Sequence, residues 1–239
     1  MRILVLQHAR VEHPAAFARY AREDGHILTT VHVDEHEALP GLGDHDALWV
    51  LGGPQDVWQE SEHPWLVAEK AFIREAVEER GLPFLGLCLG HQLLAVALGG
   101  ECAPAPVPEI GVLEVQLTEE GAHGVFFDDV PERFTVLQWH GAEVVRMPPG
   151  ASCLATSECS AVQAMRWGTR AFSVQFHVEV EHDTVASWNA VPAYARALRT
   201  ALGEDGAETL ERDVAARADD FARLSERLYI NWLQTSARP

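Results

Sequence analysis

Residues 85–92 read Leu-Gly-Leu-Cys-Leu-Gly-His-Gln and lie where a short apolar run passes into a helical pattern. A cysteine between two glycines at such a junction is typical of a nucleophile elbow, because the glycines allow a sharp turn between a strand and a helix. Cys88 would then lie at a helix N-terminus, where free N–H groups and the helix dipole favour the nucleophilic thiolate. The alternative interpretation is a buried core cysteine, whose neighbouring glycines only allow close packing of strand and helix.

Short apolar runs alternate with amphipathic stretches on the N-terminal side of this elbow. The predicted strands are residues 3–6, 27–33, 47–51 and 82–87. A helical period covers residues 64–77 and ends at the Gly-Leu-Pro of residues 81–83. The alternation therefore predicts a parallel sheet with crossover helices.

Short predicted strands separated by Gly and Pro turns dominate the chain after residue 100. They are residues 111–117, 134–137, 143–147, 153–156, 161–166 and 171–176. From residue 186 the pattern is helical, with a break at residues 203–206, and we expect one apolar stripe from Leu210 to Leu228. The second half of the core is thus predicted to be β-rich, with helices at its end.

The chain has no linker rich in Pro, Gly or Ser and no internal repeat. We expect a single α/β domain over residues 1–239, with an open, mostly parallel twisted sheet and flanking helices. The core would cover about residues 1–182, and a helical C-terminal extension of about residues 186–239 would pack on it. Residues 207–233 would close the core, and a dimer or partner surface is the alternative.

The charge balance argues against nucleic-acid and membrane partners. The 239 residues include 36 acidic and 18 basic side chains, a formal charge of -18 that repels phosphate backbones and anionic lipids. No apolar run approaches the ~18 residues of a membrane span, and residues 1–8 are too short for a signal peptide, so we expect a cytoplasmic protein. The cysteines lack zinc-ribbon spacing and are expected to be reduced thiols; they are Cys88, Cys102, Cys153 and Cys159.

A second candidate group lies in residues 172–179, which read Phe-Ser-Val-Gln-Phe-His-Val-Glu. If this segment is a strand, alternation places His177 and Glu179 on one face, so that Glu179 bonds one ring nitrogen and turns the other toward a thiol. With Cys88 these residues would form a Cys-His-Glu triad. A metal site of His177, Glu179, Glu181 and His182 is the rival interpretation, but it leaves the elbow without a purpose, so we expect neither a metal nor an organic cofactor.

A third candidate is the Gly-Gly pair in residues 50–56, which read Val-Leu-Gly-Gly-Pro-Gln-Asp at the end of a predicted strand. A flexible pair there can aim the N–H of Gly53 above the nucleophile. Together with the N–H of Leu89 it would form an oxyanion hole. An ordinary strand-ending turn is the alternative interpretation.

The order Gly52-Gly53, Cys88, His177-x-Glu179 resembles the class I, or triad, glutamine amidotransferases over roughly residues 1–182. That family has a Gly-Gly-Pro strand end, a G-x-C-x-G-x-Q elbow and a late His-Pro-Glu. Further matches are Glu109-Ile110-Gly111, Gln138-Trp139-His140-Gly141 and Val162-Gln163-Ala164. They look most like the stand-alone, GMP-synthase-like branch, and the resemblance implies a flavodoxin-like sheet.

The resemblance implies a role for each matching residue. Cys88 would be the nucleophile, His177 the general base and acid, and Glu179 its orienting partner. Gly53 and Leu89 would form the oxyanion hole. The substrate-binding residues would be Gly52, Gln92, Trp139, His140 and Gly141, whereas His91 would be structural. The implied reaction releases ammonia from glutamine through a γ-glutamyl thioester on Cys88, and a synthetase in trans would accept the ammonia.

Two positions depart from the family pattern. Val178 stands where the family has proline, and valine keeps strand geometry. Ala142 replaces the aspartate of His-Gly-Asp, which would weaken recognition of an α-ammonium group, and Glu143 would point to the opposite face of a strand. The alternatives are a γ-glutamyl peptide or conjugate hydrolase with the same triad, an idle regulatory or binding module, and a cysteine hydrolase or chaperone-like protein with a different acid. The substrate, the ammonia acceptor and the oligomeric state stay open.

Overall fold

The computed structural model describes residues 1–236, and its strands form one nine-stranded sheet in the order β2-β1-β3-β4-β9-β8-β7-β5-β6. The first five strands of this order run parallel to their neighbours: β2 (Ile27–His32), β1 (Arg2–Gln7), β3 (Ala47–Val50), β4 (Phe84–Leu87) and β9 (Ala171–Val174). Every residue of β3 and β4 is buried, as expected for parallel strands covered on both faces. The open, mostly parallel sheet predicted from the sequence is confirmed for this half.

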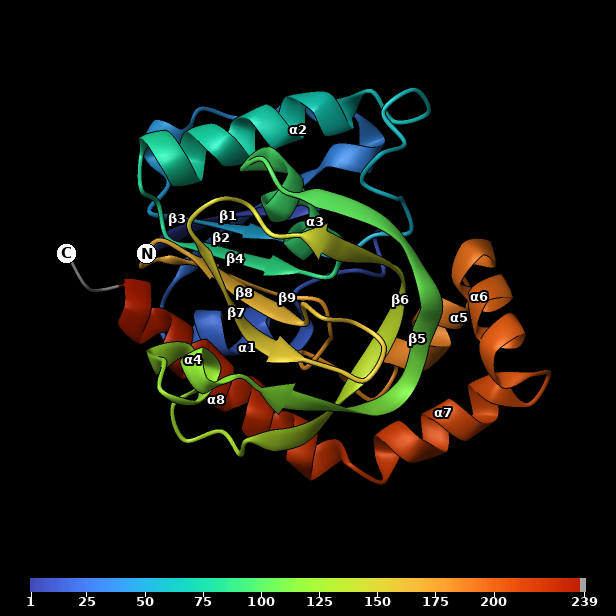
Figure 1. Cartoon of the computed structure of the whole chain (residues 1–239). Coiled ribbons are helices and arrows are strands. Elements are labelled where there is room, and N and C mark those ends of the chain that lie inside the picture. The colour runs from blue at the N-terminus through green and yellow to red at the C-terminus, as the bar shows by residue number, and fades with distance from the viewer. Residues whose placement is uncertain (237–239) are drawn as a thin grey trace.

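The rest of the sheet is antiparallel. It consists of β8 (Ala164–Trp167), β7 (Ala151–Thr156), β5 (Glu101–Leu117) and β6 (Arg133–Arg146). Long β5 and β6 pair and curve away from the parallel strands (Figure 1). The two separate strands expected at residues 134–137 and 143–147 are wrong, because β6 is continuous. β5 tolerates its prolines, since its register with β6 shifts between Pro104 and Glu109, where the ladder is interrupted.

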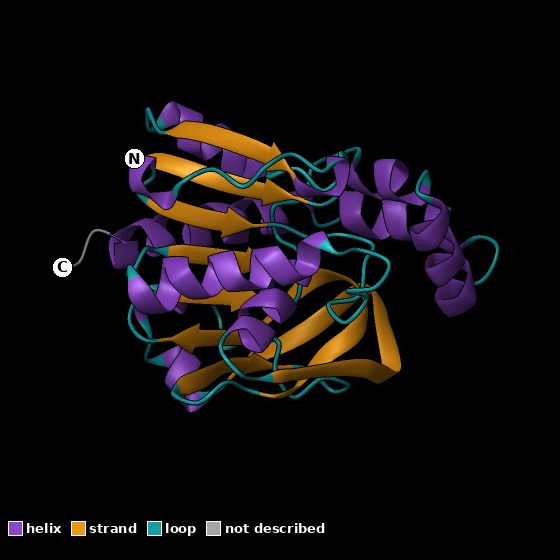
Figure 2. Ribbon diagram, turned by 90° about the horizontal axis from the view of Figure 1, so that it is seen from above, coloured by secondary structure: helices purple, strands orange, loops and turns teal. Residues whose placement is uncertain are grey.

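Helices cover both faces of the sheet, as Figures 1 and 2 show. On one face lie α2 (Trp65–Arg74), which continues as a π-helical segment over Glu75–Glu79, and α3 (Leu89–Ala97). On the other face lie α1 (Ala15–Glu23) and the long α8 (Ala218–Ser236). Short elements complete the connections: α4 (Glu119–Ala122) and 3-10 helices at Val33–Glu35, Leu42–Asp44 and Val125–Phe127.

The C-terminal region is helical, as predicted. α5 (Thr184–Asn189), α6 (Pro192–Leu202) and α7 (Gly206–Ala215) pack around the outer part of β5 and β6, before α8 crosses beneath the parallel strands (Figure 1). The single apolar stripe expected from Leu210 to Leu228 is wrong, because the chain turns between α7 and α8. Leu210 packs with α5 and α6, whereas Leu228 packs in the cluster under the parallel strands.

Helix α8 completes the core beneath β3 and β4. Trp232 is fully buried, packs edge-on against Trp49 at 5.3 Å between ring centroids, and donates a hydrogen bond from Nε1 to the carbonyl oxygen of Phe84 (3.1 Å). The four cysteines are free thiols. Within residues 1–236, no helix combines the length and the apolar character that crossing a membrane requires.

Candidate active site

Cys88 lies at the turn between β4 and α3, with backbone angles φ 51° and ψ -104°. This left-handed conformation is strained for a cysteine and is typical of functional sites. A Cβ at Gly86 would lie 2.7 Å from the carbonyl oxygen of Gly90, and one at Gly90 would lie 2.0 Å from that of Val50. The two glycines therefore allow both the sharp turn and the close packing that the sequence offered as alternatives.

His177 and Glu179 lie just past β9, which ends at Val174. The strand predicted over residues 171–176 is therefore two residues shorter, and the condition that a strand continues through Glu179 is not met. Instead, His177 is held by two backbone hydrogen bonds to Leu137 on β6, of 2.9 and 3.2 Å. Its Nδ1 is 2.6 Å from Oε1 of Glu179, whose Oε2 accepts a hydrogen bond from the N–H of Val178 (2.9 Å). Val178 thus serves this geometry through its N–H group, which proline lacks.

His177 and Glu179 shift each other's pKa toward the charged forms. Burial alone would lower the pKa of His177, but the Glu179 carboxylate and the adjacent Cys88 side chain raise it well above its usual range. Burial would raise the pKa of Glu179, and the His177 ring nevertheless lowers it. Nε2 of His177 is buried and has no hydrogen-bond partner in residues 1–236. The free nitrogen is thus available for proton transfer beside Cys88.

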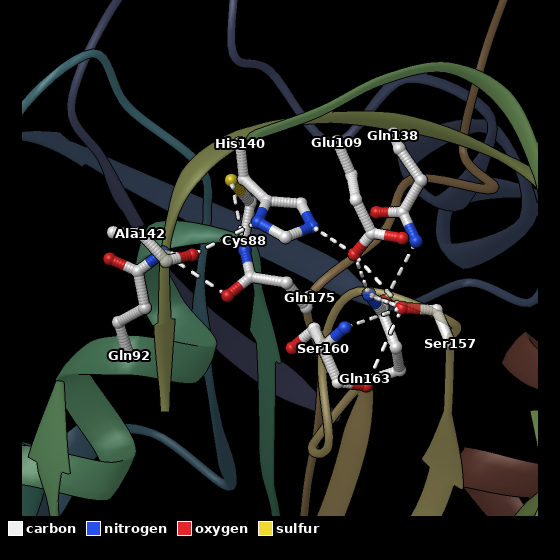
Figure 3. Close-up of polar contacts among 10 residues, drawn as sticks. All are labelled: Cys88, Gln92, Glu109, Gln138, His140, Ala142, Ser157, Ser160, Gln163 and Gln175. Atoms are coloured by element: carbon white, nitrogen blue, oxygen red, sulfur yellow. Dashed lines mark hydrogen bonds and ion pairs between the residues drawn. The ribbon is translucent and has the colours of Figure 1, made fainter. Parts of the chain in front are cut away.

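Two buried glutamines, Gln175 and Gln92, lie in a row beside Cys88 (Figure 3). Nε2 of Gln175 lies 3.6 Å from the sulfur of Cys88, and Oε1 of Gln175 accepts a hydrogen bond from Nε2 of Gln92 (3.1 Å). His91, next to Gln92, is fully buried, which lowers its pKa to about 3. Its Nδ1 contacts the Ser173 hydroxyl at 2.8 Å, which fits the structural role expected for it.

The Gly52-Gly53 pair follows β3 beside the elbow. A Cβ at Gly53 would lie 2.7 Å from Cβ of His8 and 3.0 Å from Cδ2 of Leu89, so only glycine fits. Among the residues that the structure describes, the N–H groups of Gly53 and Leu89 have no hydrogen-bond acceptor. They remain predicted donors to an oxyanion.

The predicted substrate-binding residues meet at a pocket of about 520 Å³ beside the elbow. The predicted residues in its lining are Gly53, Cys88, Leu89, Gln92, Trp139, His140 and Gly141. Helix α6 forms part of the wall through Ala193, Tyr194, Ala197, Thr200 and Ala201. Gly52, His177 and Glu179 do not line it. A second cavity of about 650 Å³, between β6 and α8, contains none of the predicted residues.

A buried polar network behind the pocket was not predicted (Figure 3). Nε2 of His140 lies 3.3 Å from Oε2 of Glu109, and Nδ1 contacts the carbonyl oxygen of Ala142 (2.9 Å). Oε2 of Glu109 also accepts hydrogen bonds from Gln163 (2.7 Å) and Ser157 (2.9 Å). The matching motifs at residues 109–111, 138–141 and 162–164 are therefore neighbours in space, and Glu109 holds His140 at the pocket.

The metal alternative has no geometric support. In the described part of the chain, no three His, Cys, Asp or Glu side chains gather as a metal site requires. The side chains of His177 and Glu179 contact each other. The hydrogen bond of Glu181 involves its backbone, whose N–H donates to the Thr184 hydroxyl (2.9 Å).

Comparison with known proteins identifies the family. The model of the family described as glutamine amidotransferase class-I matches residues 14–187. This chain belongs to the class I glutamine amidotransferases. It is 41% identical over 146 residues to the glutamine-hydrolysing GMP synthase of Aeropyrum pernix, a match that covers 61% of this chain and 26% of that protein.

Two further comparisons cover nearly the whole of this amidotransferase. The glutamine amidotransferase-like protein YfeJ of Salmonella typhimurium is 30% identical over 234 residues, which cover 96% of this chain and 95% of YfeJ. The crystal structure of a glutamine amidotransferase from Thermotoga maritima superposes with a TM-score of 0.86 at 27% identity, covering 100% of this chain and 99% of that one. The α/β fold and its helical C-terminal region are therefore shared with a solved family member.

Three residues that the sequence analysis missed lie between α5 and α6 of the amidotransferase and the His177–Glu179 pair. The ring of Trp188 packs edge-on against His177 at 4.5 Å between centroids, and its Nε1 donates to the carbonyl oxygen of Val11 (3.1 Å). The Tyr194 hydroxyl donates to Oε1 of buried Glu12 at 2.5 Å. Burial raises the pKa of Glu12, although His177 and Tyr194 oppose this shift. The sequence carried no signal for the burial of Glu12, which stands between Arg10 and His13 in a polar stretch after the first strand.

Proposed function

We propose that the protein hydrolyses the side-chain amide of glutamine through a γ-glutamyl thioester on Cys88. The observation that carries the proposal is the pairing of His177 with Glu179 at 2.6 Å, with Nε2 of His177 left unpartnered beside Cys88. A cysteine nucleophile, a base and a group that orients the base are the parts that covalent amide hydrolysis needs.

The proposed reaction has two halves. The Cys88 thiolate attacks the carboxamide carbon, and the N–H groups of Gly53 and Leu89 stabilise the oxyanion of the tetrahedral intermediate. His177 protonates the departing ammonia as the C–N bond breaks. The same histidine then removes a proton from water, which attacks the thioester, releases glutamate and restores the Cys88 thiol.

The pocket supports a substrate with a γ-glutamyl group. The pocket beside Cys88 is lined by Gln92, Trp139, His140 and Gly141. Gly52 lies in the adjacent loop, where a Cβ would come within 2.5 Å of the Glu12 carboxylate. The volume of about 520 Å³ falls in the usual range of small-molecule sites, roughly 300–1,000 Å³.

A γ-glutamyl peptide or conjugate is the second candidate substrate. Two observations favour it: Ala142 stands in the pocket where the family pattern has aspartate, and α6 adds a wall containing Ala193, Ala197 and Ala201. Such a substrate uses the same triad and differs in its leaving group, an amine in place of ammonia.

A synthetase acting in trans is the proposed acceptor of the ammonia. The support is the likeness to the Aeropyrum pernix GMP synthase, in which the matched region is 26% of the protein. The partner would contact the edge of the sheet where Cys88 and the pocket lie, since ligands of open α/β sheets bind outside the carboxyl ends of the strands.

The proposal is tested by ammonia and glutamate release from glutamine by the purified protein. A panel of γ-glutamyl peptides is measured in parallel, and Cys88→Ala is the blank. We expect release that depends on Cys88 and a thioester adduct of the glutamyl mass on the intact protein. Turnover of the peptides alone favours the conjugate hydrolase. If no substrate is turned over and Cys88 does not react with a glutamine-like alkylating agent, the proposed activity is wrong. The idle regulatory or binding module is then the remaining interpretation.

A further inference from the structure

His8 is a fully buried histidine at the end of β1 that the proposed mechanism does not use. Its Nε2 lies 2.8 Å from Oε1 of Glu69, a residue of α2 with no exposed surface, and its Nδ1 lies 3.1 Å from the carbonyl oxygen of Gly52. Burying charges costs free energy, so a buried ion pair that contacts the loop of the predicted oxyanion hole suggests a functional role.

The two contacts decide the protonation of His8. A backbone carbonyl and a carboxylate both only accept hydrogen bonds, so each ring nitrogen must carry a hydrogen. With Glu69 as a carboxylate, these contacts assign His8 as an imidazolium. Burial by itself would lower the pKa of His8, but Glu69 and the Gly52 carbonyl raise it above its ordinary value. The stacked indole of Trp65, 5.5 Å away between ring centroids, also favours a cation.

The contact with Gly52 determines where the next N–H points. The carbonyl of Gly52 and the N–H of Gly53 belong to one planar peptide group, so a donor that fixes the oxygen also fixes the N–H on the opposite side. Because the donor is charged, it polarises the peptide and strengthens the N–H as a donor. Nε2 of Gln55 donates to the carbonyl oxygen of His8 (3.2 Å), which ties the far end of the loop to the same residue.

We infer that His8, held by Glu69, is a positioning residue that aims the N–H of Gly53 at the oxyanion formed on the substrate carbonyl. The inference rests on the proposed thioester chemistry at Cys88. His8 does not line the pocket and touches no substrate, so it acts only through the Gly52–Gly53 peptide.

Two variants separate this role from a structural one. His8→Gln keeps one donor but removes the charge. The double variant His8→Leu with Glu69→Leu removes the pair without leaving a buried charge unpaired, so it is expected to fold. The matched control is Arg10→Gln, which breaks an exposed ion pair with Glu35 close by in the chain without touching Gly52.

Kinetics on glutamine and alkylation by iodoacetamide are measured on each protein. An oxyanion donor acts in the transition state, so kcat should fall about 10- to 100-fold in both His8 variants, with KM within about twofold. Alkylation of Cys88 by iodoacetamide forms no oxyanion and should keep its wild-type rate. The control should keep wild-type kcat, KM and alkylation rate. An unchanged kcat, or alkylation that falls together with kcat, overturns the inference.

A readout that needs no turnover keeps the inference testable if the proposed substrate is wrong. In ¹⁵N NMR at pH 6.5, the ordinary pKa of histidine, both ring nitrogens of His8 should be mainly protonated, with the signal assigned by its loss in His8→Gln. The amide signal of Gly53 should shift in that variant and stay in place in Arg10→Gln. A wild-type protein that turns over no γ-glutamyl compound contradicts the proposed function, whereas a neutral His8 or an unmoved Gly53 signal contradicts the inference.

Discussion

The two halves of the sheet build the site in different ways. In the parallel half, short buried strands deliver Cys88 and Gly53 through backbone geometry, and the glycines around them leave no space for a side chain. In the antiparallel half, the long β5 and β6 and helix α6 deliver His140 and Tyr194 through side chains held by buried acids. We therefore expect substitutions in the first half to change mainly kcat and substitutions in the second half to change mainly KM.

The largest effect is expected from Glu179→Gln, which tests the pair that joins the two halves. A glutamine keeps the shape but cannot stabilise an imidazolium, so kcat should fall about 10³- to 10⁴-fold, as for the acid of related triads. Steady-state glutamine hydrolysis measures this change. The control is Glu181→Gln, which removes a neighbouring carboxylate. Equal losses in both variants would contradict the triad and favour the metal alternative.

A pair of glycine variants tests whether the glycines of the parallel half are required because no side chain fits there. Gly90→Ala places a methyl group 2.0 Å from the carbonyl oxygen of Val50 and should lower the free energy of unfolding by about 3 kcal/mol or more. Gly141→Ala meets nothing within 4 Å and should change it by less than about 0.5 kcal/mol, although Gly141 lines the pocket. Urea unfolding measures both. A similar loss of unfolding free energy in the two variants would contradict the idea that only the parallel half depends on glycines without space for a side chain.

Glu109→Gln tests whether the antiparallel half controls substrate affinity. The substitution replaces a carboxylate that lies 3.3 Å from Nε2 of His140 and accepts hydrogen bonds from Gln163 and Ser157. A hydrogen bond to a charged group contributes roughly 1.5–3 kcal/mol, so its loss should loosen His140 at the pocket. KM should therefore rise about tenfold or more, with kcat within about threefold. Glu114→Gln, on the same strand in an exposed pair with Arg133, is the control. A fall in kcat at constant KM would mean that Glu109 supports the chemical step and not substrate binding.

The smallest effect concerns the pH dependence of stability at Glu12. Its pKa is raised by burial, so the folded state holds this proton more tightly than the unfolded state. Its contribution to stability is complete below the unfolded pKa, near 4.5, and is lost as the pH rises toward the folded pKa. Glu12→Gln should therefore gain stability relative to wild type as the pH rises from 4.5 to 8, measured by urea unfolding. A constant difference would mean that the pKa of Glu12 is the same in the folded and unfolded states.

The elbow was predictable because its physics is local. Two glycines around Cys88 at a strand-to-helix junction dictate the turn, and the order of the motifs along the chain indicated the family. The pairing of His177 with Glu179 was also predicted, but for the wrong reason. The strand ends at Val174, and the contact depends on the bridge from His177 to Leu137 on a distant strand, which periodicity within one segment does not reveal.

The supporting acids were missed because each pairs with a residue far along the chain. Glu69 contacts His8 across 61 positions, and Glu12 contacts Tyr194 across 182. Glu69 did carry a signal, since it falls between Leu66 and Ile73 on the buried side of α2, where a charged residue requires a partner. The continuity of β6 was missed because residues 138–142 contain a glycine and match a binding motif. Long antiparallel pairing with β5 overrides such local preference.

The burial of Trp232 under β3 and β4 has a consequence for synthesis of the chain. Four of the five parallel strands, β1 to β4, leave the ribosome early, but α8, which covers one of their faces, begins more than 130 residues after β4 ends. Until then the face around Trp49 is covered only in part, by Phe17 of α1, and exposed apolar surface favours aggregation of nascent chains. The layer that supports the nucleophile turn is therefore completed only after α8 has been made.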